Sequence, residues 1–423
     1  MRLLAAARLT KILLLGLVAG LTLLPALVRS RMRRDPALLR RAQGLALVRL
    51  CERAGPAMTK LAQLAAARAD LLPAALIAPL ARVQDRARPP STRALRRALG
   101  RAYGPSEAWP FAIDNWTPVA AGSVAAVLAA RLPGGEAIAL KVVRPGVGAR
   151  IRADLVWLGW LLGLAARLQA FRAIPLRHAF AQLAPLIARQ ADMFEEALSG
   201  TRLGMAAGPG VILPAIVPDL TRASVLAMRF ERAAHRLTDP AVPQPVYEQG
   251  CRLLLAALYR MIFVTGFVHC DLHPGNVGCD DQGRVILYDY GLVAEVTEAD
   301  RAILVGLFTA ITTRDPVRAA REILASAATI PPDLDRNSVI ADADLLLERW
   351  AGKNAGEFLV AALVRDLFAL QHRHGIVAMP SFAAAIWSLA TFEGLVRHRY
   401  PQLDFQEQAK PFLISHLLIS SRW

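Results

Sequence analysis

The chain has 423 residues, of which 55% are hydrophobic, and it carries 50 Lys and Arg against 34 Asp and Glu, for a net charge of +16. This length and apolar content predict two or three domains and exclude an intrinsically disordered chain. A protein with many membrane spans is not expected, because only one uninterrupted apolar run in the sequence approaches the roughly 18 residues that a span needs.

The positive charge lies near the start of the chain. Residues 1–100 carry 19 basic and 4 acidic side chains, whereas the remaining residues carry 31 and 30. Within the basic part, residues 12–28 form an apolar run with basic neighbours at Lys11, Arg29, Arg31, Arg33 and Arg34. As a helix this run would rise about 26 Å, slightly less than a hydrocarbon core of ~30 Å. We predict a membrane anchor within residues 1–34, with a core helix or a helix lying in the membrane interface as alternatives.

The charge around this run also predicts a partner and a location. The stronger positive charge after the run would keep the body of a spanning protein on the cytoplasmic side, as at a bacterial inner membrane. The basic segment has no aromatic residue before Tyr103 on which a nucleic-acid base could stack. We therefore expect an anionic membrane surface as partner, and no nucleic acid.

The elements predicted for the rest of the chain do not alternate regularly between strand and helix. Residues 36–100 are predicted to be helical, and the apolar stretches 124–130 and 137–143 are predicted to form a hairpin. Beyond them we expect helices at 149–170, 177–203, 244–265 and after 297, and short strands at 224–230, near 277 and at 285–288. This order predicts an α+β fold with a small β-containing lobe, a helical lobe and a helical N-terminal extension. The predicted domains are 1–34, 35–110, 111–235 and 236–423.

The strongest motif is the segment His269–Asn276, followed by Asp289-Tyr290-Gly291. The first part has the H-x-D-x-x-x-x-N spacing of a kinase catalytic loop, and the second is similar to D-F-G. Mg²⁺ prefers hard oxygen ligands, so Asn276 and Asp289 are predicted to hold it from two sides of a hairpin. Asp271 is predicted to orient or deprotonate the phosphoryl acceptor.

Two other interpretations of this loop remain. His269, Cys270, Asp271 and His273 are all zinc-ligand types, but four ligands within five residues do not surround one ion without strain. The segment is also compatible with a solvated polar loop between hydrophobic elements.

Lys141 is a candidate phosphate ligand on the second strand of the predicted hairpin. It lies between apolar neighbours in a chain that otherwise uses Arg, with five Lys against 45 Arg. Strand lysines of kinases hold nucleotide phosphates and pair with a helical Glu. Asp192 and Glu196, four residues apart, are predicted to share one helix face and to attract such a cation or a metal.

One feature of ordinary protein kinases is absent from the sequence. Where a glycine-rich phosphate loop would precede the first strand, the chain reads Pro118-Val119-Ala120-Ala121-Gly122-Ser123. This difference separates the chain from ordinary protein kinases.

Together these motifs resemble the UbiB/AarF family of atypical protein-kinase-like proteins. The K-x-G-Q motif of that family is similar to Lys60-Leu61-Ala62-Gln63, and its alanine-rich loop to Ala120–Ser123. Its E-x-D motif falls on Gln190-Ala191-Asp192, with the Lys-pairing glutamate at Glu196. The resemblance extends from about residue 45 to about residue 415. Several positions depart from the family pattern, namely Ala62, Gly122, Ala126, Gln190 and Tyr290.

The resemblance implies a protein-kinase-like two-lobed fold that binds ATP and Mg²⁺. It implies catalytic roles for Lys141, Glu196 and Asp271, and metal binding by Asp192, Asn276 and Asp289. The implied nucleotide-binding residues are Lys60, Gln63, Ala120, Ala121, Gly122, Ser123 and Lys141, with the helix of Lys60 and Gln63 acting as a lid.

The expected function is ATPase activity or small-molecule or lipid-linked phosphotransfer that supports ubiquinone or other isoprenoid-lipid metabolism. The expected partners are membrane lipid or prenyl-lipid pathway proteins. A small-molecule kinase of the aminoglycoside-phosphotransferase type and a nucleotide-gated scaffold without turnover are the alternatives.

Overall fold

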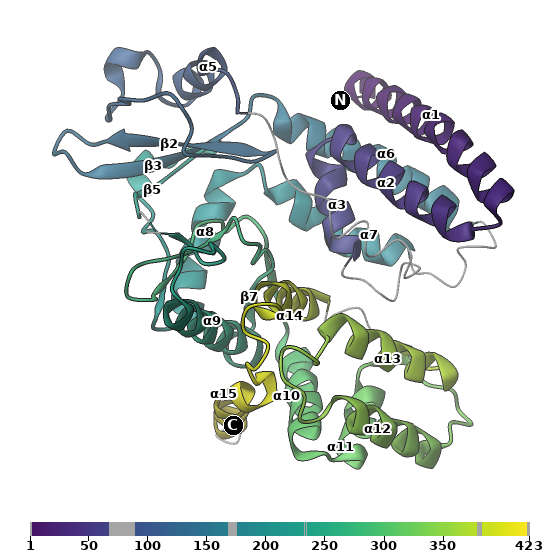
Figure 1. The fold of residues 1–423 in the computed structure, drawn as a ribbon. Helices are drawn as coiled ribbons and strands as arrows, with labels where there is room; N and C mark the ends of the chain where they lie inside the picture. Colours follow the sequence, from purple (N-terminus) through teal and green to yellow (C-terminus); the bar gives the residue numbers. More distant parts are fainter. Residues whose placement is uncertain are drawn as a thin grey trace. The chain divides into compact units, whose positions relative to one another are not determined.

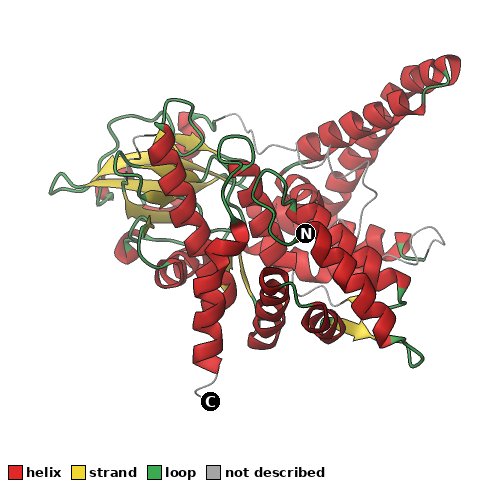
Figure 2. Ribbon diagram, turned by 60° about the horizontal axis from the view of Figure 1, so that its bottom comes forward, coloured by secondary structure: helices red, strands yellow, loops and turns green. Residues whose placement is uncertain are grey.

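The computed structural model describes residues 2–66, 89–167, 176–231, 233, 235–378 and 383–420. The chain forms two compact units, which we describe separately. The N-terminal unit comprises residues 1–198 and 215–230, and the C-terminal unit comprises residues 199–214 and 231–423. Helices predominate and are mixed with short sheets (Figure 2), so the predicted α+β class is confirmed.

The N-terminal unit contains an antiparallel sheet in the order β1-β2-β3-β5 (Figure 1). Its strands are β1 (Ala120–Ala121), β2 (Ala125–Arg131), β3 (Ala137–Val143) and β5 (Val225–Arg229). Leu128 and Leu140 are fully buried beneath Leu95 and Leu99 of α5 (Thr92–Tyr103). This apolar contact fixes β3, the strand that carries Lys141, in the interior of the sheet.

The other described helices of this unit are α1 (Arg2–Arg33), α2 (Pro36–Ala54), α3 (Pro56–Ala66), α6 (Val147–Ala165), α7 (Leu176–Arg189) and the start of α8 (Met193–Ala207), with 3₁₀ turns at Ser106–Ala108 and Pro218–Leu220. The Asp35 carboxylate accepts the Ala37 N–H at 2.8 Å and so caps α2. α2 ends at Gly55, whose φ of +122° favours glycine, and Pro56 begins α3. Gly55 and Pro56 therefore separate the two helices.

The strands of the C-terminal unit surround the motif-bearing loops. β7 (Phe267–His269) pairs antiparallel with β10 (Val293–Glu295). A second sheet has the order β4-β9-β8-β6. Its strands are β4 (Val211–Ile212), β6 (His235–Arg236), β8 (Val277–Cys279) and β9 (Val285–Leu287). β8 and β9 form the hairpin predicted on either side of the turn at Asp280–Gly283.

Helices make up most of the remaining described part of the C-terminal unit. They are α9 (Gln244–Tyr259), continued by a π-helical segment (Arg260–Thr265), α10 (Glu298–Thr313), α11 (Pro316–Ala325), α12 (Arg336–Trp350), α13 (Val360–Arg373), α14 (Ala383–Val396) and α15 (Phe405–Ser420). The rings of Tyr259 and Phe263 stack at 5.4 Å between centroids, and Phe308 of α10 lies edge-on to Phe263 at 5.0 Å. These aromatic contacts join α9 and its π-helical continuation to α10.

Two sequence-based expectations about the elements were wrong. The predicted single helix 177–203 is divided into α7 and α8 by residues 190–192. The region after residue 297 is not wholly helical, because β11 (Ala327–Thr329) pairs with β12 (Val377–Ala378). A pair of strands this short, about 50 residues apart in the chain, has too few residues to give a periodic sequence pattern.

Candidate nucleotide-binding and phosphoryl-transfer site

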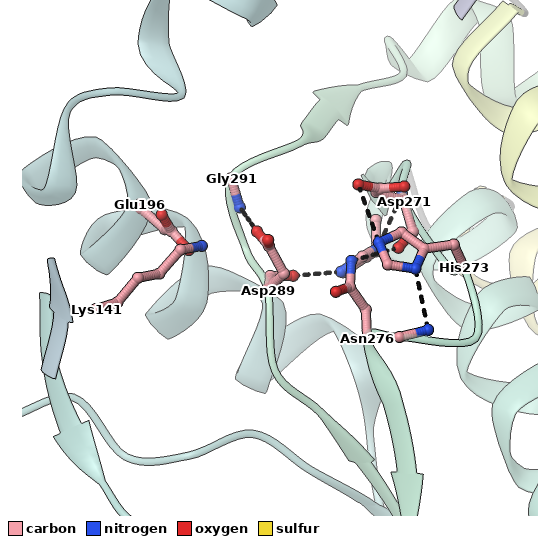
Figure 3. Close-up of polar contacts among 9 residues, drawn as sticks. Lys141, Glu196, Asp271, His273, Asn276, Asp289 and Gly291 are labelled. Carbon is pink, nitrogen blue, oxygen red and sulfur yellow. Dashed lines mark hydrogen bonds and ion pairs between the residues drawn. The ribbon is translucent and has the colours of Figure 1, made fainter. Parts of the chain in front are cut away.

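Lys141 and Glu196 form a buried ion pair within the N-terminal unit (Figure 3). Lys141 lies on β3 between Val127 of β2 and Leu226 of β5. Its Nζ donates to Oε1 of Glu196 on α8 at 2.5 Å, and the two side chains are 11% and 2% exposed. The structure thus brings together the two residues that the sequence analysis paired, in the arrangement by which kinases orient the phosphate-binding lysine.

Asp192 does not share a helix face with Glu196, contrary to the sequence-based prediction. It precedes α8, is exposed, and accepts the N–H of Phe194 through Oδ1 at 3.0 Å. This bond satisfies one of the unpaired donors at the start of the helix. The D-x-x-E spacing from Asp192 to Glu195 is similar to a capping box and is the signal that predicts a helix start here. Its role as a metal ligand stays a prediction.

The alanine-rich segment forms a tight hairpin. Ala120 and Ala121 pair with β2, and the N–H of Gly122 donates to the carbonyl of Ala125 at 2.9 Å. The carbonyl of Gly122 accepts Nε of Arg144 at 2.8 Å. Both backbone groups of Gly122 are therefore used within the N-terminal unit, which distinguishes this hairpin from a glycine-rich loop whose free N–H groups bind phosphates.

Lys60 and Gln63 lie on α3, which packs against α6 and α7. Their spacing on one helix is as predicted, but their side chains lie outside the described part of the structure. The lid role of this helix stays a prediction.

The loop that carries the H-x-D-x-x-x-x-N motif begins at the end of β7. His269 pairs with Val293 of β10, and the backbone N–H of Cys270 donates to the Leu292 carbonyl at 2.8 Å. The hydroxyl of Ser388, buried on α14, donates to the His269 carbonyl at 2.7 Å. The loop that carries Asp271 is thus attached to a strand pair on one side and to a helix on the other.

His269 is fully buried and links the two motifs of this unit. Its Nδ1 accepts the backbone N–H of Asp271 at 3.1 Å, so the proton lies on Nε2, which donates to the Asp289 carbonyl at 2.5 Å. Burial lowers the pKa of His269, although the Asp289 carbonyl and nearby carboxylates oppose this effect. His269 is a neutral structural link between the loop of Asp271 and that of Asp289.

Asp271 and Asn276 are both nearly buried and are held within one loop. Nδ2 of Asn276 donates to the Asp271 carbonyl at 3.0 Å, which leaves the carboxamide oxygen as the atom with which Asn276 can bind a cation. His273 accepts the N–H of Gly275 through Nδ1 at 3.0 Å and places Nε2 3.9 Å from Oδ2 of Asp271. The imidazole therefore faces the predicted catalytic carboxylate.

Asp289 follows β9 after one intervening residue, Tyr288, and Asn276 directly precedes β8. The two predicted metal ligands therefore flank one antiparallel hairpin, in which Val277 is opposite Leu287. Oδ1 of Asp289 accepts the N–H of Gly291 at 2.9 Å, which fixes the carboxylate (Figure 3). One carboxylate and one carboxamide oxygen are a donor set that suits Mg²⁺.

The geometry argues against the zinc interpretation of this loop. Both ring nitrogens of His269 are occupied by hydrogen bonds to the backbone. Burial raises the pKa of the Cys270 thiol to about 12, so the thiol remains protonated, and it donates to the Val268 carbonyl at 3.4 Å. Among the residues that the structure describes, no group of three or more His, Cys, Asp and Glu side chains is arranged to hold a metal.

Two positions near these motifs were missed in the sequence analysis. Ser388 is 119 residues from His269, and a single serine in an apolar helix gives no signal of that contact. Gly200 of α8 lies directly against the Tyr290 ring. A glycine one helical turn after Glu196 was the sequence signal that could have indicated a close contact there. Arg202, also on α8, forms an ion pair with Glu295 at 2.6 Å.

A strand lysine paired with a helical glutamate, together with H-x-D-x-x-x-x-N and D-Y-G elements on a strand-flanked loop, defines a protein-kinase-like fold. Residues 82–323, more than half of the chain, match the ABC1 atypical kinase-like domain. The chain therefore belongs to the ABC1 atypical kinase-like family, and the kinase-like fold expected from the motifs is confirmed.

Curated relatives and a solved structure agree with this assignment. A protein from Azotobacter vinelandii, named probable protein kinase UbiB, is 30% identical over 372 residues, covering 85% of this chain and 68% of the relative. A protein of the same name from Marinobacter nauticus is 28% identical over 376 residues, covering 86% of this chain and 68% of the relative. The structure of Rv3197 from Mycobacterium tuberculosis in complex with erythromycin is similar in fold, with a TM-score of 0.58, 16% identity, and coverage of 88% of this chain and 90% of that one.

Proposed function

We propose that the protein binds Mg·ATP and uses it for ATP hydrolysis or for phosphoryl transfer to a small or lipid-linked acceptor. The observation that carries this proposal is the buried Lys141–Glu196 pair at 2.5 Å. Burying two charges costs free energy of folding, so a buried pair in this position supports a functional role for it. Lys141 would bind the nucleotide phosphates and Glu196 would hold its ammonium in place. Asp271 would orient the acceptor and take up its proton.

Asn276 and Asp289 would hold Mg²⁺ through one carboxamide and one carboxylate oxygen. When bound, the ion neutralises phosphate charge and so favours transfer. Asp289 is fixed by Gly291 and Asn276 by the Asp271 carbonyl, so neither side chain has to be ordered when nucleotide binds. Nearly fixed ligands reduce the entropy that binding loses.

The similarity to UbiB proteins supports a role in ubiquinone or other isoprenoid-lipid metabolism at a membrane. Among the described residues, one helix, Ala6–Arg33, is long and apolar enough to cross a membrane. Prenyl-lipid and quinone profiles of a deletion strain, complemented with the wild type or Asp271→Asn, test this role. Restoration of the normal profile by Asp271→Asn would contradict a catalytic contribution.

Nucleotide binding is tested by the thermal stability of the purified chain with ATP, with and without Mg²⁺. ATP at 100 times its Kd is expected to add about 2.7 kcal/mol to the free energy of unfolding. Asp289→Asn should lose most of this gain, whereas Asp281→Asn, an exposed residue in the β8–β9 turn, should retain it. An unchanged Mg·ATP effect in Asp289→Asn would overturn the metal assignment.

A nucleotide-gated scaffold without turnover is a second candidate, favoured by the uncharged, buried Gln190 at a position where the family carries an acid. Phosphate release by the wild type distinguishes the two. Release that Asp271→Asn abolishes without loss of Mg·ATP binding supports catalysis. Binding without release by the wild type supports the scaffold.

A further inference from the structure

Helix α1 contains the long apolar run of the chain, yet it is not isolated. It lies beside α2 and α6 in the N-terminal unit (Figure 1) and packs against both. Its length and composition alone would allow it to cross a membrane. The contacts of its two faces allow a more specific conclusion.

A buried ion pair joins one face of α1 to α6. Nε and Nη2 of Arg8 donate to the two carboxylate oxygens of Asp154 at 2.7 and 2.6 Å, and Asp154 is completely buried. Nη2 also donates to the Ala54 carbonyl at the end of α2, at 2.5 Å. Ile12 packs with Trp157, whose indole N–H also reaches Asp154 at 3.3 Å. A buried, bidentate ion pair of this kind holds α1, α2 and α6 together.

The opposite face of α1 is apolar and exposed. Its large side chains are 41% to 61% exposed and recur three to four residues apart along the helix, at Leu13, Leu14, Leu17, Val18, Leu21, Leu24 and Val28. We call these seven residues the apolar stripe. A continuous apolar stripe on a helix whose other face is packed marks a surface that water does not cover in the functional state.

An orientation in which α1 crosses the bilayer is incompatible with the charges on its neighbour α2. That helix packs along α1 and carries exposed arginines at Arg40, Arg41 and Arg49. If α1 crossed the bilayer with α2 beside it, these guanidinium groups would enter the hydrocarbon, where charge is strongly disfavoured. If α1 crossed alone, Asp154 would be left buried without Arg8.

The charges around the stripe indicate what covers it. Exposed basic side chains flank it at both ends, at Lys11, Arg29, Arg31, Arg33 and Arg34. An apolar stripe with basic flanks is the pattern of a helix that lies in the plane of an anionic membrane surface. A second protein copy with the same basic flanks would be repelled there.

We propose that α1 stays folded on α2 and α6 and inserts the apolar stripe into one leaflet of an anionic bilayer, in the membrane plane. This inference rests on the membrane association in the proposed function and specifies its mode. Both ends of α1 then lie on the same side of the membrane.

The orientation is tested with single cysteines at the two ends of α1, Ala7→Cys and Arg33→Cys, in the full chain. The native cysteines are all buried, so a membrane-impermeant maleimide reports on the new ones. The purified protein is added to preformed phosphatidylglycerol–phosphatidylethanolamine vesicles, and reagent is applied outside. We expect both positions to be labelled to the same extent as after detergent is added. Protection of Ala7→Cys alone would show that α1 crosses and would overturn the inference, although membrane association would stand.

The stripe itself is tested by co-flotation of the chain with the same vesicles. Leu17→Asp and Leu21→Asp are each expected to weaken vesicle binding at least tenfold. Leu345→Asp, the same change at a residue of similar exposure on α12, should leave binding unchanged. The Mg·ATP thermal shift should persist in all three variants, which separates this surface from the nucleotide site. Equal binding by all variants, or no vesicle binding by the wild type, would overturn the inference.

Discussion

The ring of Tyr290 lies so close to Gly200 that a Cβ built on the glycine would be 2.6 Å from Cδ2 of the ring. Tyr290 is fully buried, and its hydroxyl is 3.4 Å from the Pro214 carbonyl. The residue before it, Asp289, is the predicted metal ligand. A glycine on α8 therefore sets the position of the D-Y-G segment within the C-terminal unit.

Gly200→Ala is expected to destabilise the protein by about 1–3 kcal/mol, because the buried ring cannot move away without disturbing its neighbours. It should also weaken the Mg·ATP thermal shift, since moving Tyr290 moves Asp289. The matched control is Gly204→Ala on the same helix, where a Cβ would meet nothing within 4 Å. Alanine there should stabilise the protein by about 0.5–1 kcal/mol through helix propensity. Urea unfolding of both variants measures the contrast, and equal effects at the two positions would contradict this packing argument.

Lys141→Met should lower the free energy of unfolding by about 3–5 kcal/mol, because it removes the ammonium that pairs with the buried Glu196 carboxylate. Glu196→Gln introduced into that variant should restore part of the loss by removing the charge. Lys410 makes an equally short ion pair with Glu407, at 2.5 Å, but both side chains are exposed. Lys410→Met should therefore cause no measurable change in the same urea experiment. A small loss in Lys141→Met would mean that water reaches the Lys141–Glu196 pair.

The neutral state of His269 predicts a pH dependence of stability. Below the ordinary histidine pKa of 6.5, His269 of the unfolded chain gains a proton, whereas burial lowers its pKa in the folded protein. The unfolded state then binds more protons, so stability falls as the pH is lowered from about 6.5 towards 5, by up to about 1.4 kcal/mol per pH unit. His269→Gln should flatten this slope relative to the wild type, and the exposed His398→Gln should not. Unfolding titrations at several pH values measure the slopes, and identical slopes in all three proteins would contradict a neutral, buried imidazole.

The segment after D-Y-G predicts that protein substrates are not phosphorylated in trans at useful rates. Val293–Glu295 pairs with β7, Thr297 caps α10 through the Asp300 N–H, and α10 begins at Glu298. This short connection leaves no extended loop on which a peptide could bind, as the activation segment of protein kinases provides. Radiolabelled ATP with generic protein substrates, measured beside phosphate release, tests this expectation. Stoichiometric protein labelling that exceeds phosphate release and disappears in Asp271→Asn would show protein kinase activity.

The sequence predicted those parts of the fold that depend on neighbouring residues. The strand Ala137–Val143 and its partner β2 follow from two apolar stretches and a turn, and the β8–β9 hairpin follows in the same way. The motif spacing placed Asn276 and Asp289 on either side of that hairpin, because a tight turn fixes which residues come together. The pairing of Lys141 with Glu196 required the family resemblance, since 55 residues separate them.

Contacts between distant residues were not predictable in this way. β7 and β10 are three residues long, too short to give a pattern that predicts their pairing, and the ring of His269 connects the two loops. Ser388 supports the same loop from α14 without any local pattern. The exposed stripe of α1 was also not evident, because residues 12–28 read as uniformly apolar and only their packing separates one face from the other.

The contact between Arg8 and Asp154 spans 146 residues, and this separation matters during synthesis. At a translation rate of about 5–20 residues per second, Arg8 is synthesised roughly 7–30 seconds before the residue that neutralises it. In that interval α1 is an apolar nascent helix without its permanent neighbours, and cellular targeting factors or chaperones compete for it. Whether α1 is delivered into a translocation channel or folds onto the later helices is then decided by relative rates.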